Sequence, residues 1–424
     1  MRSVIIFFAF FLTLGSAAMA QGDNKMNPAT TPLPGDSVIP GAERTAVYVP
    51  LIKGKRIGIF ANPTSMVGKT HIVDTLLKLG IDIKMIFGPE HGFRGTADAG
   101  EKVGNYTDEK TGIPVVSLYG AKRRPSPEDL KDLDILVFDI QDVGVRFYTY
   151  ISSLQEYMEA AFENSKPLLI LDRPNPNGFY VDGPVLDMKF KSFVGMQPVP
   201  TVYGMTLGEY AMMIAGERWL SSEKANAKYD YYRTAENSED TAFHFLVIKV
   251  RKYEHKTKCQ LPVRPSPNLP DIQSIYLYPS TCLFEGTVFS EGRGTDKPFQ
   301  KIGHPLMAKN LYSFTPQPNE GAKNSKHYFE KCYGWNLGGK PEEVAKEVDN
   351  HVQLKWIINA YNQFPGKDSF FLKSNSFNRL AGNDVLMQQI KDGRSEEDIR
   401  KSWEPALTEY KKIRKKYLMY PDFE

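Results

Sequence analysis

Short apolar segments alternate with helical segments through the first half of the chain, and this alternation constrains the fold more than any other feature of the sequence. Strands are predicted over residues 56–61, 83–87, 115–118, 135–138 and 168–171, and helices over 71–79, 125–131 and 154–164. Strands that alternate with helices form parallel sheets, because each helix carries the chain back across the sheet. The pattern predicts an α/β fold with a Rossmann-like parallel sheet.

The length of the chain indicates two domains, because 424 residues exceed what one hydrophobic core usually supports. We assign residues 41–235 to the Rossmann-like domain and residues 236–424 to a smaller α+β domain. The second part starts with a predicted strand over 245–248 and a proline-rich stretch over 262–270. It also contains an amphipathic pattern that predicts one helix over 342–360.

The first 20 residues have the parts of a secretory signal peptide: Arg2, an apolar run over 4–12, and a small-residue cleavage site that ends at Ala20. Residues 21–40 have no periodicity and predict a flexible N-terminal segment. No later segment reaches the ~18 apolar residues that a membrane-spanning helix needs. We therefore expect an exported protein, periplasmic or secreted, with no integral membrane segment in the mature chain.

The cysteine count leaves one thiol without a partner in an oxidising compartment. The chain has Cys259, Cys282 and Cys332, so one disulfide and three buried free thiols are both compatible with the sequence. The sequence does not decide between them.

Composition and motifs argue against nucleic acid and nucleotide ligands. A net charge of +3 and the lack of a long basic tract predict no nucleic-acid partner. Gly68-Lys69-Thr70 is like the end of a phosphate-binding loop, but the position five residues before Gly68 is Pro63, where that motif requires glycine. No dinucleotide fingerprint follows a predicted strand, and the histidines lack metal-ligand spacing, so we expect neither a cofactor nor a metal.

A glycine-rich loop after the second predicted strand is the best candidate active site. Residues 86–95 read Ile-Phe-Gly-Pro-Glu-His-Gly-Phe-Arg-Gly, so the strand ends at Gly-Pro and is followed by Glu90, His91 and Arg94. Open α/β sheets bind ligands at the carboxyl ends of their strands. A salt bridge between Glu90 and Arg94 is the structural alternative to a catalytic role.

A second polar cluster follows the predicted strand at 135–138 and contains Asp139, Gln141, Asp142, Arg146 and Tyr148. Because parallel strands end at the same edge of a sheet, this loop and the Glu90 loop are expected to face one crevice. Paired carboxylates are the catalytic groups of many glycosidases, one as general acid and the other as base or nucleophile. Loop capping and pairing of the aspartates with Arg146 is the structural alternative.

Two further segments carry candidate substrate-binding residues. The loop after the strand at 168–171 is stiffened by two prolines, and a segment of the second half places charged residues among glycines. An arginine between two glycines suits an exposed guanidinium that binds an anion. The candidates are Asp172, Arg173, Asn175, Glu285, Glu291 and Arg293.

From about residue 56 to residue 420 the chain resembles the exo-β-N-acetylmuramidase family. The similarity rests on motifs in a fixed order: Gly-Pro-Glu-His-Gly-Phe-Arg-Gly (88–95), Val-Phe-Asp-Ile-Gln-Asp-Val-Gly-Val-Arg-Phe-Tyr-Thr-Tyr (137–150), Leu-Asp-Arg-Pro-Asn-Pro-Asn-Gly (171–178), Val-Asp-Gly-Pro-Val-Leu (181–186), Gly-Met-Thr-Leu-Gly-Glu (204–209), Pro-Ser-Pro-Asn-Leu-Pro (265–270), the segment 285–299, and Leu-Ala-Gly-Asn-Asp (380–384).

The resemblance implies a Rossmann-like catalytic domain, a smaller second domain over the cleft, and exo-acting release of terminal β-linked N-acetylmuramic acid from peptidoglycan fragments. Glu90 matches the proposed catalytic glutamate of the family and is expected to be the general acid. The chain departs from the pattern at Tyr203, where a histidine is expected, so no substrate role is carried over to this position.

Three points stay open at the level of sequence. Asp139 or Asp142 is expected either to act as nucleophile or base or to orient the acetamido group of the substrate. The lactyl carboxylate of muramic acid calls for a cation such as Arg146 or Arg293. A non-catalytic wall-binding protein, and a wall amidase or esterase, are the alternatives to a glycosidase.

Overall fold

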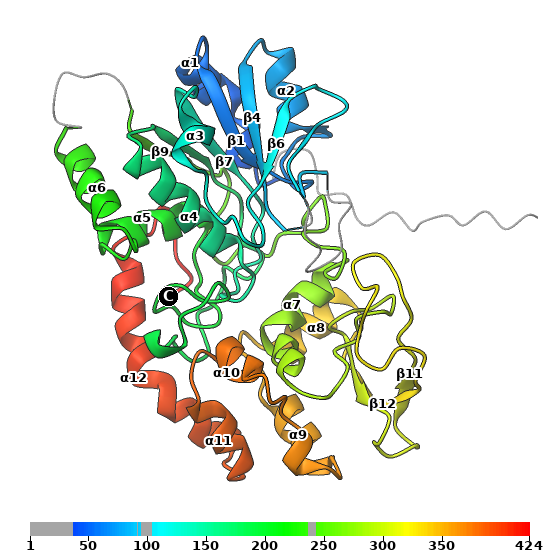
Figure 1. The fold of residues 1–424 in the computed structure, drawn as a ribbon. Helices are drawn as coiled ribbons and strands as arrows, with labels where there is room; N and C mark the ends of the chain where they lie inside the picture. The colour runs from blue at the N-terminus through cyan, green and yellow to red at the C-terminus, as the bar shows by residue number, and fades with distance from the viewer. Residues whose placement is uncertain (1–36, 91, 95–103, 236–242) are drawn as a thin grey trace, which may run out of the picture. The chain divides into compact units, whose positions relative to one another are not determined.

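The computed structural model describes residues 37–90, 92–94, 104–235 and 243–424, and Val38–Glu424 form one compact unit (Figure 1). Its main feature is a seven-stranded sheet in which every neighbouring pair is parallel except β5 with β6. The predicted α/β fold with a Rossmann-like sheet is thus confirmed. From one edge to the other, the strands are β5 (Tyr106–Thr107), β6 (Pro114–Ser117), β4 (Asp82–Gly88), β1 (Arg56–Ala61), β7 (Ile135–Asp139), β8 (Leu168–Leu171) and β9 (Phe245–Ile248).

The order of the parallel strands is that of a doubly wound Rossmann sheet. Taken along the chain, β1, β4, β6, β7, β8 and β9 are the first to sixth parallel strands, and they lie in the order three, two, one, four, five, six. The order reverses between β1 and β7, where Ala61 is paired with Asp139. Ligands of such folds bind outside the carboxyl ends of the strands near this reversal.

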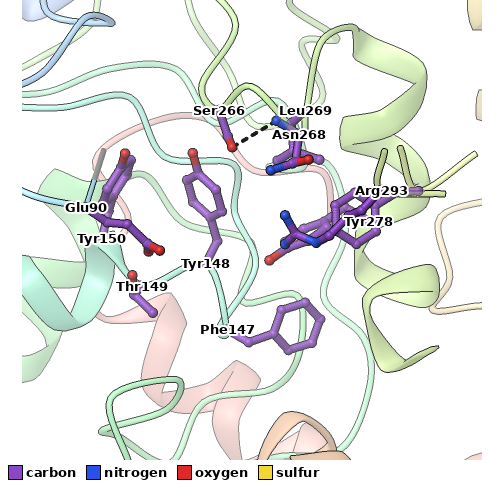
Figure 2. Close-up of a pocket in the computed structure, with 11 residues that line it drawn as sticks. Glu90, Phe147, Tyr148, Thr149, Tyr150, Ser266, Asn268, Leu269, Tyr278 and Arg293 are labelled. Carbon is purple, nitrogen blue, oxygen red and sulfur yellow. Dashed lines mark hydrogen bonds between the residues drawn. The ribbon is translucent and has the colours of Figure 1, made fainter. Parts of the chain in front are cut away.

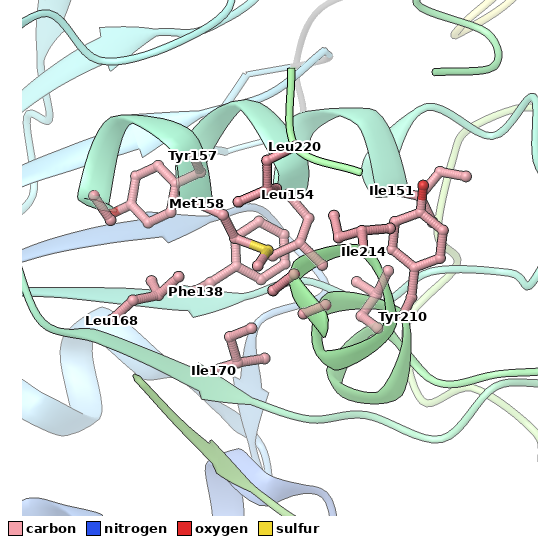
Figure 3. Close-up of a cluster of buried hydrophobic side chains, with 14 of the residues drawn as sticks. Phe138, Ile151, Leu154, Tyr157, Met158, Leu168, Ile170, Tyr210, Ile214 and Leu220 are labelled. Carbon is pink, nitrogen blue, oxygen red and sulfur yellow. The ribbon is translucent and has the colours of Figure 1, made fainter. Parts of the chain in front are cut away.

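Different helices cover the two faces of the sheet, because side chains alternate along each strand. On β8, Leu168 and Ile170 belong to the cluster that α4 (Tyr150–Glu163) and α5 (Leu207–Gly216) bury, as Figure 3 shows. Leu169 and Leu171 belong to the opposite cluster, which α1 and α2 cover. The bounds of these two helices are Thr45–Ile52 (α1) and Ile72–Lys78 (α2).

A separate core forms around α7 in the second half of the chain. It also buries Val143, Val145 and Phe147, which follow β7, so the segment after this strand belongs to the sheet edge and to the second core. A three-stranded antiparallel sheet lies in the same half, in the order β10-β12-β11. The elements here are α7 (Ile272–Thr281), β10 (Lys301–His304), β11 (Tyr312–Phe314), β12 (Cys332–Asn336), α8 (Pro341–Val348), α9 (Lys355–Gln363), α10 (Ser376–Ala381), α11 (Val385–Lys391) and α12 (Glu396–Lys415).

Two segments from beyond residue 236 pack onto the first half. Strand β9 is the edge strand of the large sheet, paired with β8. Helix α12, red in Figure 1, extends from α11 towards α5, and Tyr410 Oη donates to the Tyr203 carbonyl at 2.7 Å. Arg414 Nε donates to the Gly204 carbonyl at 2.9 Å. The division at residues 235/236 stays a prediction. The contacts show that residues beyond 236 contribute to the large sheet as well as to the second core.

The single helix predicted over 342–360 is wrong, since the structure has two helices there, α8 and α9. Asp349 and Asn350 separate them with φ of 48° and 57°, the left-handed region that ends a helix. The peptide N–H of Val352 then donates to Asp182 Oδ2 at 2.7 Å. An amphipathic pattern continues across this break because both helices bury their apolar side on the same core.

The three cysteines are buried and free, so no disulfide joins Cys259, Cys282 or Cys332. In the part of the chain that the structure describes, none of the helices has the length and apolar character needed to span a bilayer.

We predict that Gly382→Ala destabilises the fold because of Arg146. Gly382 ends α10 with φ +80°, and an added Cβ would lie 2.4 Å from Arg146 Nη1. Gly393 has φ +70° but open space around it, so Gly393→Ala is a matched control that carries the backbone strain alone. Overpacking typically costs ~1–3 kcal/mol, so the free energy of unfolding in urea should fall by roughly that much more for Gly382→Ala. Equal losses in the two variants would show that Arg146 is not rigidly held.

Candidate active site

A pocket of about 490 Å³, part of it open to solvent, lies at the carboxyl edge of the large sheet. Its walls come from both halves of the chain: Glu90 and the segment after β7 on one side, and the proline-rich segment, α7 and the Arg293 loop on the other (Figure 2). The lining residues are Glu90, Phe147, Tyr148, Thr149, Tyr150, Ser266, Asn268, Leu269, Tyr278, Arg293 and Phe299.

Glu90 reaches this pocket because β4 ends at Gly88-Pro89. The Gly92 N–H donates to the Pro89 carbonyl at 3.0 Å and closes a turn around Glu90. Space at Gly88 is limited, since a Cβ there would meet the Phe93 nitrogen at 3.2 Å. Glu90 is half-buried, and its carboxylate is directed into the pocket in Figure 2.

Tyr119 adjoins Glu90 from the neighbouring strand, and the sequence analysis did not identify it. Burial raises the pKa of Tyr119 to about 12, and the nearby charge of Glu90 and a side-chain hydrogen bond with Glu90 contribute to this rise. The signal available in the sequence was its position two residues after the end of β6, at the same sheet edge as Glu90.

Aromatic side chains form one wall of the pocket. The rings of Tyr148 and Tyr150 meet edge to face at 4.9 Å, and Tyr148 and Tyr278 do so at 6.0 Å. Tyr148 Oη donates to the Pro265 carbonyl at 2.7 Å, and Asn62 Nδ2 donates to Tyr150 Oη at 2.9 Å. Tyr148 is the member of this wall that the sequence analysis selected. Such a wall can pack against the apolar face of a sugar while its hydroxyls bind the polar edge.

Arg293 lines the opposite side of the pocket. Its Nη2 and Nε donate to Glu285 Oε1 at 2.7 and 3.2 Å, and Nε lies 3.5 Å from Glu291 Oε1. Glu291 is buried and also pairs with Lys326 at 2.8 Å. Burial by itself lowers the pKa of Arg293, but the two carboxylates more than offset this and raise it, so the guanidinium is a permanent cation. The structure thus brings Arg293, Glu285 and Glu291 together.

Asp139 lies beneath the sheet edge and does not line the pocket. Its two oxygens accept hydrogen bonds from Arg173 Nε and Nη2 at 2.6 and 2.9 Å, and both side chains are almost fully buried. The Arg173 guanidinium also donates to the Met66 carbonyl at 2.9 Å. The partner of Asp139 is therefore Arg173, where the sequence analysis considered Arg146.

Asp142 is also enclosed and does not line the pocket. One of its oxygens accepts hydrogen bonds from Tyr203 Oη and, at 2.6 Å, from the Gly144 N–H. The other oxygen, Oδ1, has no hydrogen-bond partner among the described residues. Burial raises the pKa of Asp142 to about 7, although both hydrogen bonds act in the opposite direction. Tyr203, the departure from the family pattern, thus belongs to the surroundings of Asp142.

Arg146 is fully buried away from the pocket. It donates to the carbonyls of Pro184, Val199 and Leu380 at 3.3, 3.2 and 2.8 Å. Burial lowers its pKa to about 9. The Arg146 guanidinium links the three segments that carry these carbonyls, so Arg146 has a structural role.

The other predicted residues that the structure describes make hydrogen bonds within the protein and do not line the pocket. Arg94 is paired with Asp108 through two hydrogen bonds of 3.0 and 2.8 Å. Asp172 accepts from Tyr420 Oη at 2.6 Å, and Asn175 donates to the Met205 carbonyl at 2.8 Å. Gln141 is buried and donates to the Pro174 carbonyl at 2.7 Å. His91 lies outside the described residues.

Several lining residues were not selected from the sequence. Thr149 and Tyr150 close the motif 137–150, Tyr278 is in α7, and Ser266 and Asn268 belong to the proline-rich segment. In the proline-rich segment, the sequence signal was the presence of short polar side chains between prolines. Across residues 37–90, 92–94, 104–235 and 243–424, no group of three or more His, Cys, Asp or Glu side chains is arranged to hold a metal ion.

Comparison with known proteins finds similarity to one family over nearly the whole chain. Residues 57–273 match the family model described as exo-beta-N-acetylmuramidase NamZ, N-terminal, and residues 276–420 match its C-terminal counterpart. The peptidoglycan beta-N-acetylmuramidase NamZ of Bacillus subtilis (strain 168) is 37% identical over 451 aligned residues, which cover 99% of this chain and 100% of that protein.

Two solved structures are similar to this fold, and both are DUF1343 family proteins from Bacteroides fragilis NCTC 9343. The first is 45% identical with a TM-score of 0.79, and the match covers 91% of this chain and 99% of the other. The second is 27% identical with a TM-score of 0.71, and the match covers 91% of this chain and 100% of the other.

We predict that Asp142 makes stability depend on pH. Its pKa is raised from 3.8 to about 7 in the folded chain, so its contribution to stability is full below the unfolded pKa and is lost as the pH rises towards 7. Asp142→Asn resembles the protonated acid but cannot ionise. The free energy of unfolding of the wild type, measured in urea relative to this variant, should therefore fall between about pH 4 and about pH 7 and level off above.

Other titrating groups, Asp172 included, are present in both proteins and cancel in this difference. A difference that does not change with pH would contradict the raised pKa of Asp142.

Proposed function

The chain belongs to the exo-beta-N-acetylmuramidase NamZ family and is a glycosidase, and on this premise we propose that it releases terminal β-linked N-acetylmuramic acid from peptidoglycan fragments with Glu90 as general acid. The observation that carries the proposal is the carboxylate of Glu90 directed into a pocket with an aromatic wall. A carboxylic acid in such a position can protonate the glycosidic oxygen as the bond to C1 breaks.

The surroundings of the two aspartates argue against either of them as the second catalytic group. Asp139 is held at both oxygens by Arg173, and Asp142 is enclosed, so neither carboxylate meets the sugar in this arrangement. Among the described residues that line the pocket, Glu90 is the carboxylate. We therefore propose that the acetamido oxygen of the substrate attacks C1 while Glu90 protonates the leaving group, and that Glu90 then activates the water that completes hydrolysis.

Arg293 supports selection of a muramic acid over a sugar that lacks the lactyl group. It faces the pocket from the side opposite Glu90 (Figure 2), and its Nε and Nη2 are occupied by Glu285. The remaining nitrogen, Nη1, has no hydrogen-bond partner in the described part of the chain and can donate to a lactyl carboxylate. Arg146, the other candidate cation, is committed to three backbone carbonyls.

The proposed location follows from the N-terminal sequence. The signal-peptide pattern of residues 1–20 supports export, to the periplasm or beyond, where peptidoglycan fragments are present. Residues 1–36 lie outside the described residues, so this part of the proposal rests on the sequence alone.

We predict that Glu90→Gln abolishes most hydrolysis of a nitrophenyl β-N-acetylmuramide. General acid–base catalysis contributes ~10²–10⁴-fold, so kcat should fall within that range. The matching β-N-acetylglucosaminide, assayed in parallel with the wild type, tests whether the lactyl group is required. Urea denaturation should show that the variant is folded.

The alternatives give different results in the same assay. A non-catalytic wall-binding protein would cleave neither glycoside, and an amidase or esterase would release peptide or acid from peptidoglycan fragments without free sugar. Hydrolysis that is unchanged in Glu90→Gln would contradict the assignment of the acid.

We also predict that Arg293→Lys weakens binding of the muramide. Lysine keeps the charge but lacks the planar fork, and a hydrogen bond to a charged group contributes ~1.5–3 kcal/mol, so KM should rise ~10–100-fold while kcat changes less. Arg264→Lys is the matched control, because Arg264 is paired with Glu320 at 2.7 Å and lies outside the pocket lining. An equal loss for the muramide and the glucosaminide would sink the lactyl assignment.

A further inference from the structure

Two neighbouring strands end in step with each other at the catalytic edge. Gly88, the last residue of β4, is paired with Ser117, the last residue of β6. Two residues beyond this pair, β4 is followed by Glu90 and β6 by Tyr119. Because parallel neighbours lie about 4.8 Å apart, residues at equal distances beyond a pair emerge side by side. The sheet register thus places Tyr119 and Glu90 at the same edge of the sheet, each two residues beyond a paired position.

The loop that carries Tyr119 is fixed at both ends. At its start, the Leu118 N–H donates to the Gly88 carbonyl at 2.8 Å, and Leu118 itself is buried. At its end, Ser126 caps α3 (Pro127–Leu130) with a reciprocal capping box to Asp129. Between them, Arg123 lies over the Phe193 ring at 4.3 Å. The loop is therefore anchored to the scaffold on both sides of Tyr119.

A tyrosine hydroxyl beside a carboxyl group has two effects. It fixes one carboxyl oxygen and thereby orients the carboxyl group, and it donates a hydrogen bond that stabilises the carboxylate once the proton has left. Both effects assist a general acid. Tyr119 is half-buried, and its pKa is raised by burial, by the charge of Glu90 and by a side-chain hydrogen bond with Glu90, in agreement with the register that places both residues at this edge.

We propose that Tyr119 is a positioning residue for Glu90: its hydroxyl holds one oxygen of the carboxyl group and stabilises the carboxylate that forms when the glycosidic oxygen is protonated. The inference rests on the proposed function, since it requires Glu90 to be the general acid. Tyr119 acts through Glu90 and needs no contact with the sugar, which agrees with its absence from the pocket lining.

The test uses leaving groups of different acidity. An alcohol leaving group needs full protonation by the acid, whereas a dinitrophenolate leaves with little help, so a defect confined to the acid is seen with the first substrate and not with the second. We would measure kcat/KM, which reports cleavage of the glycosidic bond and not the later step in which Glu90 activates water. The proteins are full-length wild type, Tyr119→Phe and Glu90→Gln, and the substrates are a disaccharide of N-acetylmuramic acid β-linked to N-acetylglucosamine and a dinitrophenyl β-N-acetylmuramide.

Tyr119→Phe is expected to lower kcat/KM for the disaccharide ~10–100-fold, the effect of losing one hydrogen bond to a charged group, and to change kcat/KM for the dinitrophenyl glycoside less than ~3-fold. Tyr417→Phe is the matched control, because Tyr417 Oη donates to Glu217 Oε1 at 2.7 Å in a similar partly buried pair away from the pocket. It should leave both rates unchanged, and thermal unfolding of both variants checks that they fold.

The outcomes separate the two proposals. Equal losses on both substrates, or no loss on either, would overturn the role of Tyr119 while Glu90→Gln still shows the leaving-group effect. If Glu90→Gln itself lacks that effect, the acid assignment fails and the role of Tyr119 fails with it. A thermal midpoint of Tyr119→Phe far below that of Tyr417→Phe would indicate a structural role and also overturn the proposal.

Discussion

The buried ion pair between Asp139 and Arg173 holds together the edge of the sheet on which the site is built. It joins the ends of β7 and β8, and Arg173 also reaches the Met66 carbonyl in the short hairpin after β1. Two charges that are removed from water are stable only when both are fully hydrogen-bonded, and here the guanidinium and the carboxylate meet in two parallel bonds. The loops that form the pocket start from this fixed point.

The segment after β7 connects this edge of the sheet to the second core. Its apolar residues Val143, Val145 and Phe147 enter the second core, while Tyr148, Thr149 and Tyr150 face the pocket. Tyr148 donates to Pro265 and so fixes the proline-rich wall. The pocket is therefore shared by two cores, and Glu90 and Arg293 face each other because one segment is buried in both.

Much of the fold was predictable, because it depends on local patterns. The apolar strands at 56–61, 135–138 and 168–171 are buried on both faces, so their sequences are continuous apolar runs bounded by turn residues. The single helix predicted over 342–360 was wrong because Asp349 and Asn350 adopt left-handed conformations. Asp182, far away in sequence, stabilises the break between the two helices. The edge position of β9 likewise depends on pairing with a distant strand.

The sequence by itself determined that polar residues follow apolar strands, and hence that Glu90, Asp139 and Asp172 gather at one edge of a parallel sheet. Only the tertiary structure decided which of them face the pocket. Arg146 donates to three carbonyls, Asp139 is paired with Arg173, and Asp172 accepts from Tyr420. A buried charge or polar group needs a hydrogen-bond partner, and the packing of the chain determines which partner is near. Glu90 and Arg293 lie where two cores leave a cavity, and no periodicity in the sequence records where such a cavity forms.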